Sequence, residues 1–182
     1  SMIESPMPTR AEVSDVATAI YEGADAIMLS AESAAGDFPI EAVTTMNNVA
    51  MEVENDPVYL DVMDASRAGK KQTIADAIVS AAREIAETTD IKAIVCYSES
   101  GTTAALTARE RPHVPIIAMT SRARTARKLC LYWGMHCMVT GEVDRFKMAV
   151  VNAARAARTF GFATETDNIV VTAGVPFNQP GS

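Results

Sequence analysis

The chain has 182 residues, of which 48% are hydrophobic and 21% charged, and its formal net charge is −7. This length and apolar content exclude wholesale disorder and suit one domain, or one domain with part of a second. An acidic pI near 4.8 argues against a nucleic-acid partner, which needs a clustered positive face. No apolar run reaches the ~20 residues of a membrane helix, and no secretory leader opens the chain, so we expect no membrane partner.

Residues 1–54 predict a helix, a strand, a loop and a second helix. Thr9 and Glu12 have the spacing of a capping box, which indicates a helix start. Apolar residues then recur at helical spacing until Gly23, a residue typical of the position just after a helix.

The apolar run 26–29 is typical of a strand buried on both faces, and Ser30 stands at its carboxyl end. After a loop over 31–38, Pro39 is suited to the first position of a second helix. One face of that helix is expected to carry Ile40, Val43, Ala50 and Val53. A single strand cannot form a sheet, so it either packs on the rest of the chain or has partners elsewhere.

Residues 55–72 mix charges without sustained periodicity. We interpret them as a linker, with a short helical turn around 58–63.

Residues 73–182 alternate helical and strand patterns. Helices are expected from Thr73, over 101–110, 121–131 and 144–160, and strands over 91–97, 115–119, 137–140 and 168–172. The first and last of these helices are expected to bury the stripes Ile74, Ile78, Ala81, Ala82, Ile85 and Phe146, Val150, Ala153, Ala157, Phe160. This order predicts an α/β fold, an open and mainly parallel sheet with helices on both faces.

Ligands of open parallel sheets bind beyond the carboxyl ends of the strands. That rule selects four loops, at 98–103, 120–124, 140–144 and 174–182.

The first of these loops joins a strand directly to a helix. Free backbone N–H groups, the positive helix end and four hydroxyls there suit a phosphate, and Gly101 permits close approach. The alternative is that Ser98 or Ser100 only caps the helix. Glu99 counts against an anion unless its carboxylate points away.

The remaining polar groups give weaker signals. Cys96, Cys130 and Cys137 lack a C-x-x-C spacing and fit reduced thiols, and Cys130 with His136 and Cys137 lacks a fourth ligand, so no metal site is predicted. Glu32 and Asp37 flank Ser30 either as a catalytic cluster or as a capping network. A basic cluster is expected to be a solvated helix face: Arg122, Arg124, Arg127 and Lys128.

Several stretches together resemble the pyruvate kinase family. They are 8–17 (PTRAEVSDVA), 23–43 (GADAIMLSAESAAGDFPIEAV), 98–103 (SESGTT), 109–112 (RERP) and 174–177 (GVPF). The resemblance implies that 1–54, before the linker 55–72, is the end of a (β/α)₈ catalytic barrel. It implies that 73–182, after the linker, is the C-terminal α/β effector and assembly domain.

The family transfers a phosphoryl group from phosphoenolpyruvate to ADP in the cytoplasm, with Mg²⁺ and K⁺, as a homotetramer. The resemblance implies that this chain is part of such an enzyme. Because the family's metal, lysine and potassium positions are missing from the sequence, we expect no bound cofactor and no activity from the chain alone.

The resemblance also assigns roles to residues. Ser30 matches a catalytic serine, although Ala31 and Ala35 replace the family's usual glycine and lysine. An effector phosphate, from a sugar phosphate or AMP, is expected at Ser98, Ser100, Gly101, Thr102, Thr103 and Gly174. A subunit interface is expected at Thr9, Arg10, Glu12 and Asp15.

Two other hypotheses stay open. The chain is a stand-alone, non-catalytic module that binds a sugar phosphate or a nucleotide, or it is an assembly domain that only supplies subunit contacts.

Overall fold

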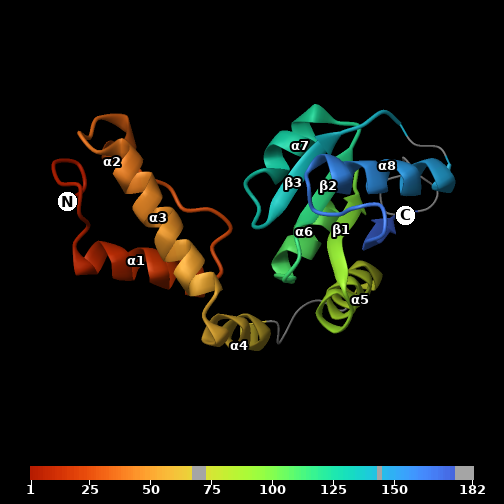
Figure 1. The fold of residues 1–182 in the computed structure, drawn as a ribbon, viewed down its shortest axis with the longest axis horizontal. Helices are drawn as coiled ribbons and strands as arrows, with labels where there is room; N and C mark the ends of the chain where they lie inside the picture. Colours follow the sequence, from red (N-terminus) through yellow and green to blue (C-terminus); the bar gives the residue numbers. More distant parts are fainter. Residues whose placement is uncertain (67–72, 143–144, 175–182) are drawn as a thin grey trace. The chain divides into compact units, whose positions relative to one another are not determined.

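The computed structural model describes residues 1–66, 73–142 and 145–174. The chain forms two compact units, 1–69 and 70–182, drawn in Figure 1. None of the helices in the described ranges is long and apolar enough to cross a membrane.

The N-terminal unit consists of helices. They are α1 (Arg10–Tyr21), α2 (Ala31–Ala34), α3 (Pro39–Glu54) and α4 (Pro57–Ser66). The predicted capping box begins α1, and Gly23 follows this helix at a positive φ of 83°, so both predictions are confirmed. Pro39 is also confirmed as the first residue of α3. A small core of Ile20, Val53, Tyr59 and Met63 joins α1, α3 and α4.

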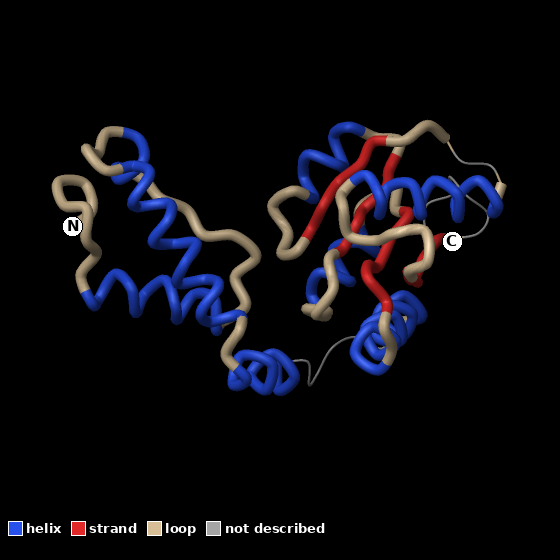
Figure 2. Tube along the Cα trace, in the orientation of Figure 1, coloured by secondary structure: helices blue, strands red, loops and turns tan. Residues whose placement is uncertain are grey.

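The predicted strand over 26–29 is wrong. Residues 26–29 form neither helix nor strand, and the Met28 side chain is 86% exposed. Figure 2 shows this segment as loop. The physical reason is that a strand satisfies its backbone groups only through a neighbouring strand, and residues 1–66 contain no other.

Two further expectations for this unit need correction. Ile40 and Val43 are 77% and 55% exposed, so the predicted apolar face of α3 is buried only in part. Within the predicted linker, residues 57–66 form the whole of α4 rather than one turn, because Tyr59 and Met63 bury themselves against the neighbouring helices.

The C-terminal unit alternates helices and strands, as predicted. In chain order they are α5 (Ile74–Thr88), β1 (Ile91–Tyr97), α6 (Thr102–Arg109), β2 (Ile116–Thr120), α7 (Ala123–Leu129), β3 (Met135–Val139), α8 (Phe146–Thr159) and β4 (Asn168–Ala173). The sheet order is β3-β2-β1-β4 and every described pairing is parallel, which confirms the α/β fold.

Both faces of the sheet are covered. Ile94 of β1 and Ile116 of β2 lie in a cluster with α5, α6 and α7, whereas Val95 and Ile117 point to the other face, against α8. All four of these side chains are fully buried. Successive side chains along each strand therefore point alternately into two apolar cores, one on each face of the sheet, as expected for a parallel sheet covered on both faces.

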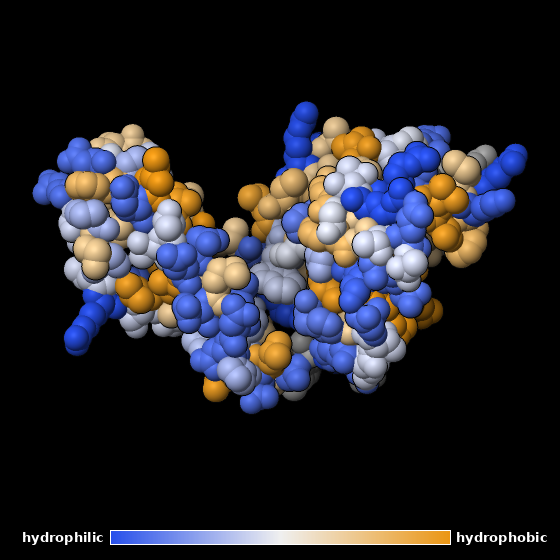
Figure 3. Space-filling model, viewed as in Figure 1, coloured by the Kyte–Doolittle hydropathy of each residue, from blue (hydrophilic) through white to orange (hydrophobic). Residues whose placement is uncertain are grey.

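The two predicted helix stripes are wrong in part. Ile74, Ile78 and Ile85 are exposed, and α5 instead turns Val79, Ala82 and Ala86 inward. On α8, Phe146 and Val150 are exposed while four alanines face the sheet: Ala149, Ala153, Ala156 and Ala157. Small residues let a helix lie close to the sheet, and the larger side chains beside them remain outside. Figure 3 shows apolar residues among hydrophilic ones on the visible surface.

Candidate functional site

The strand ends of the C-terminal unit bring the predicted loop 98–103 to one edge of the sheet. The Ser98 N–H donates to the Met119 carbonyl at 3.0 Å, so the end of β1 stays aligned with β2, and Ser98 is buried. The chain then turns at Gly101, and α6 begins at Thr102. A strand that runs directly into a helix start is the arrangement that the sequence predicted.

Gly101 is required at this turn by both conformation and space. Its φ of +84° lies in the left-handed region. A Cβ there would lie 3.1 Å from Thr125 Cγ2 and 3.3 Å from Leu129 Cδ2, both on α7. The glycine therefore lets the start of α6 pack closely against α7.

The N-cap of α6 is Gly101 rather than Ser98 or Ser100, but the Ser100 hydroxyl just before it contacts the first helical residue. This hydroxyl accepts from the Thr102 N–H at 3.3 Å and donates to Thr102 Oγ1 at 3.0 Å. Thr102 is exposed and Thr103 is half-buried. The hydroxyls of this loop thus already organise the start of α6.

The Glu99 carboxylate is directed to a different helix. Its two oxygens accept from the Ser121 N–H at 2.9 Å and from the Ser121 hydroxyl at 2.6 Å, and Arg122 Nε lies 3.5 Å away. The Glu99 carbonyl accepts from the Thr125 hydroxyl at 3.0 Å. The negative charge therefore serves the start of α7 and not the start of α6.

These contacts also correct the predicted start of α7. The N-cap is Arg122 and the helix begins at Ala123, because the Ser121 hydroxyl donates to Glu99 instead of capping. Arg124, Arg127 and Lys128 are exposed, as expected for a solvated basic face.

The other side of the proposed effector site is described only in part. Gly174 follows β4 directly and is half-buried. The remainder of the expected loop, 175–182, lies outside the described residues.

The residues expected at a subunit interface lie at the N-cap and in the first half of α1. The Thr9 hydroxyl accepts from the Glu12 N–H at 3.3 Å, and Glu12 Oε2 accepts from the Thr9 N–H at 2.7 Å. Hydrogen bonds from the N-terminal ammonium, Ser1 and Thr9 lower the pKa of Glu12 to about 2. Arg10 and Asp15 are exposed.

Ser30 lies in a capping arrangement. Its N–H donates to Glu32 Oε2 at 3.0 Å, its carbonyl accepts from the Ser33 hydroxyl at 3.4 Å, and it immediately precedes α2. Of the two alternatives for Glu32, the structure shows the capping contact. Across the described ranges, no three His, Cys, Asp or Glu side chains gather as a metal ion would need.

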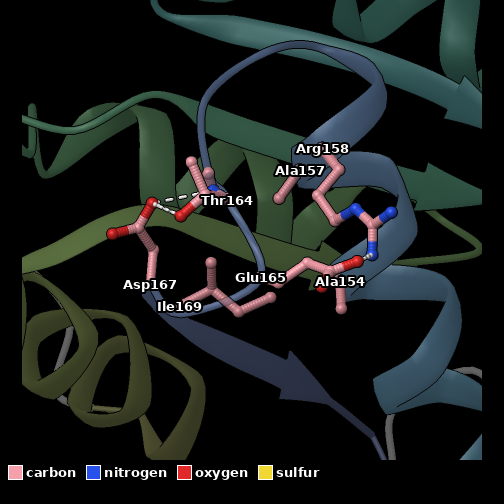
Figure 4. A pocket seen from close by; sticks show the side chains of 8 residues that line it. Ala154, Ala157, Arg158, Thr164, Glu165, Asp167 and Ile169 are labelled. Carbon is pink, nitrogen blue, oxygen red and sulfur yellow. Dashed lines mark hydrogen bonds and ion pairs between the residues drawn. The ribbon is translucent and has the colours of Figure 1, made fainter.

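A hollow of about 230 Å³ lies between the end of α8 and the start of β4, which Figure 4 shows from close by. Its charged side chains are all engaged: Arg158 pairs with Glu165 at 3.0 Å, and Asp167 accepts from the N–H and the hydroxyl of Thr164, each at 2.7 Å. β4 begins beside this hollow and runs parallel to β1, whose carboxyl end leads into loop 98–103. The hollow therefore lies at the opposite end of the strands from that loop.

Sequence reasoning missed an ionic network between α5 and the end of α6. Glu110 is 3% exposed and lies 3.6 Å from both Arg83 and Arg109, and Arg109 also pairs with Asp76 at 2.5 Å. The Thr73 hydroxyl is the main cause that lowers the pKa of Asp76 to about 2, with Arg109 next. The spacing of Thr73 and Asp76 is a capping signal that could have revealed part of this network.

The comparisons with known proteins agree with one another. The family model described as the pyruvate kinase alpha/beta domain matches residues 76–182, and that of the pyruvate kinase barrel domain matches residues 1–43. Pyruvate kinases from Methylorubrum extorquens and Geobacillus stearothermophilus are 48% and 41% identical over the whole chain. The chain spans 38% and 31% of their respective lengths.

A solved structure gives the same result in three dimensions. A pyruvate kinase from Cryptosporidium parvum matches 98% of the chain with a TM-score of 0.87 and 34% identity, and the match covers 36% of that structure. Since the alpha/beta-domain match alone includes more than half of the residues, the chain belongs to the pyruvate kinase family.

Proposed function

We propose that this chain is part of an enzyme that transfers a phosphoryl group from phosphoenolpyruvate to ADP, giving pyruvate and ATP in the cytoplasm. The family membership supports this activity for the whole protein, of which the chain represents a portion. Mg²⁺ and K⁺ are its proposed cofactors. The described residues offer no clustered ligands for a metal, so we assign no catalytic step to these ions within this chain.

The chain by itself is proposed to be inactive. Its proposed active-site contribution is Ser30, and that residue precedes α2 in an exposed loop with no neighbouring strand in residues 1–66. Transition-state stabilisation in phosphoryl transfer depends on positioned cationic groups and metal ions. A lone hydroxyl cannot replace them.

A direct assay tests this statement. The purified chain is incubated with phosphoenolpyruvate, ADP, Mg²⁺ and K⁺, and ATP is measured, with the complete Methylorubrum extorquens enzyme as the positive control. We expect no ATP above the blank. ATP formation that the Ser30→Ala variant loses would contradict the proposal.

The regulatory role is proposed for the loop 98–103 together with Gly174, as a site for the phosphate of a sugar phosphate or of AMP. The observation that carries this proposal is the direction of Glu99, whose carboxylate binds Ser121 and so does not oppose an anion at the start of α6. Anions favour a helix N-terminus, where N–H groups and the dipole both point to them. The hydroxyls of Ser100, Thr102 and Thr103 would add donors.

Calorimetric titration with ribose 5-phosphate, AMP, fructose 1,6-bisphosphate and inorganic phosphate tests this site. We expect a phosphorylated compound to bind, and the Ser100→Ala variant to bind it several-fold more weakly. Ser80→Ala, on the exposed surface of α5, is the matched control and should bind normally. Absence of binding by all four compounds would leave the loop as a helix cap.

The compactness of the unit 70–182 keeps the non-catalytic regulatory module as a second candidate. This candidate would be favoured by two results together. Calorimetry would show that an effector binds, and the complete natural protein would show no kinase activity.

Assembly is the third proposed role, with Thr9, Arg10, Glu12 and Asp15 at a contact between subunits of a homotetramer. Arg10 begins α1 and Asp15 lies in the middle of this helix, and both side chains are exposed and therefore accessible to a partner. Sedimentation of the complete protein tests the role. We expect a tetramer, and we expect Arg10→Ala and Asp15→Ala to weaken it. A strictly monomeric protein would contradict the assembly role.

A further inference from the structure

The Glu99 carboxylate belongs to the loop that begins α6, but it is bound at the start of α7. Its Oε1 accepts from the Ser121 N–H at 2.9 Å and its Oε2 accepts from the Ser121 hydroxyl at 2.6 Å. Arg122 Nε lies 3.5 Å from Oε2, and the Arg122 side chain is 62% exposed. Because an exposed ion pair contributes little and hydrogen bonds to a charged group are strong, Ser121 supplies the main restraint on the carboxylate.

The start of α6 offers the same carboxylate a second place to bind. Glu99 is three positions before Thr102, the first residue of this helix, and the N-cap is Gly101, which makes no side-chain hydrogen bond to the first turn. Backbone N–H groups and the helix dipole attract an anion at such an end, whether it is a phosphate or a carboxylate of the protein itself. A released Glu99 side chain would therefore compete with a phosphate there.

The backbone of Glu99 is held separately from its side chain. The Glu99 carbonyl accepts from the Thr125 hydroxyl at 3.0 Å. Next to it, a Cβ added at Gly101 would lie 3.1 Å from Thr125 Cγ2, so the loop packs directly on α7. Neither contact involves Ser121. Loss of the Ser121 hydroxyl should therefore release the carboxylate while the loop stays in place.

We propose that Glu99 is a built-in competitor of the effector phosphate, and that Ser121, assisted by Arg122, is the positioning residue that keeps its carboxylate away from the start of α6. This inference rests on the proposed effector site and adds how that site is kept open. In the observed arrangement the negative charge stabilises the start of α7 and leaves the start of α6 to an external anion.

A double-mutant cycle followed by calorimetry tests this regulation. The folded chain is titrated with ribose 5-phosphate, AMP, fructose 1,6-bisphosphate and inorganic phosphate. Ser121→Ala should weaken binding of the tightest of these compounds by roughly three- to fivefold, the size of a charge effect at a helix end. Glu99→Gln removes the charge but keeps an acceptor for Ser121, so it should bind at least as tightly as the wild type. The double variant should bind like Glu99→Gln, because the competitor is then neutral.

The double variant separates this role from a merely structural one. If Ser121→Ala only loosened the loop, the weakening would persist after Glu99→Gln, whereas loss of a competing charge is reversed by it. Arg122→Ala should weaken binding by about twofold or less, since its ion pair is exposed. Arg127→Ala, on the exposed face of the same helix, and Ser80→Ala are the matched controls and should bind like the wild type.

The outcomes distinguish this inference from the site on which it rests. Equal affinities of the wild type and Ser121→Ala, or a weakening that Glu99→Gln does not reverse, would overturn the inference and leave the proposed effector site intact. Absence of binding by every protein, Glu99→Gln included, would contradict the effector site itself and the inference with it. Circular dichroism of each variant verifies that lost binding does not reflect unfolding.

Discussion

Each unit of this chain contains a short apolar segment, but only the one in the C-terminal unit forms a strand. In the C-terminal unit the apolar segment 94–96 is a fully buried part of β1 between two parallel neighbours, β2 and β4. In the N-terminal unit the equally apolar segment 26–29 has no strand beside it within residues 1–66 and remains irregular. Helices do not show this dependence, because their hydrogen bonds lie within one segment. Strand formation therefore depends on a neighbouring strand and not on the apolar segment alone.

Amide hydrogen exchange should show the largest contrast between the units. We expect amides of 94–96 to exchange more slowly than those of 26–29 by a factor on the order of 10³ or more, because β1 opens only with global unfolding. Exchange measured by NMR on the intact chain gives both values together. Equal protection of the two segments would mean that 26–29 does find a strand partner.

Core truncation should next show how strongly the sheet depends on its packing. Ile94→Ala removes a fully buried side chain and should lower the free energy of unfolding by roughly 2–5 kcal/mol. Urea unfolding followed by fluorescence of the single tryptophan, Trp133, reports on the C-terminal unit. Ile74→Ala, at an 82% exposed position, is the control and should change stability by less than about 0.5 kcal/mol.

Replacement of glycine by alanine tests the tight contact between Gly101 and α7. Gly101 and Gly161 both have positive φ, so alanine at either should cost about 1–2 kcal/mol in backbone strain. Only at Gly101 would the new Cβ also press on α7, which should add about 1–3 kcal/mol. The same urea experiment measures the free energy of unfolding of both variants. Equal decreases for the two variants would show that α7 moves away from the new Cβ without loss of stability.

Lowering the pH should decrease the stability of both units, by less than the core and glycine substitutions do. The Asp76 carboxyl has its pKa lowered from 3.8 to about 2, so its contribution to stability is complete above about pH 4 and disappears as the pH falls through about 2. In the N-terminal unit the Tyr21 hydroxyl, which donates to Asp56 at 2.7 Å, lowers the pKa of Asp56. Thermal unfolding between pH 2 and 5 should therefore be less steep in pH for Asp76→Asn and for Asp56→Asn. A slope unchanged in both variants would contradict these assignments.

Local signals in the sequence were sufficient for much of the fold. The Thr9 and Thr73 caps, the proline at the start of α3 and the alternation over 91–173 all correspond to observed elements. Caps were predictable because they depend on residues close in sequence. The strand patterns over 91–173 succeeded because parallel neighbours are present to pair with them. The direction of Glu99 could not be predicted, because its partner Ser121 comes 22 positions later, on another strand end.

Motifs, caps and glycines act through neighbouring residues, so they were enough to indicate the family, the alternation of helices and strands and the loop that begins α6. Long-range packing, in contrast, set which stripe of α5 and α8 faces the sheet and where the Glu99 charge lies. Those outcomes depend on contacts between segments far apart in the chain, and a periodic pattern contains no information about the surface it will meet.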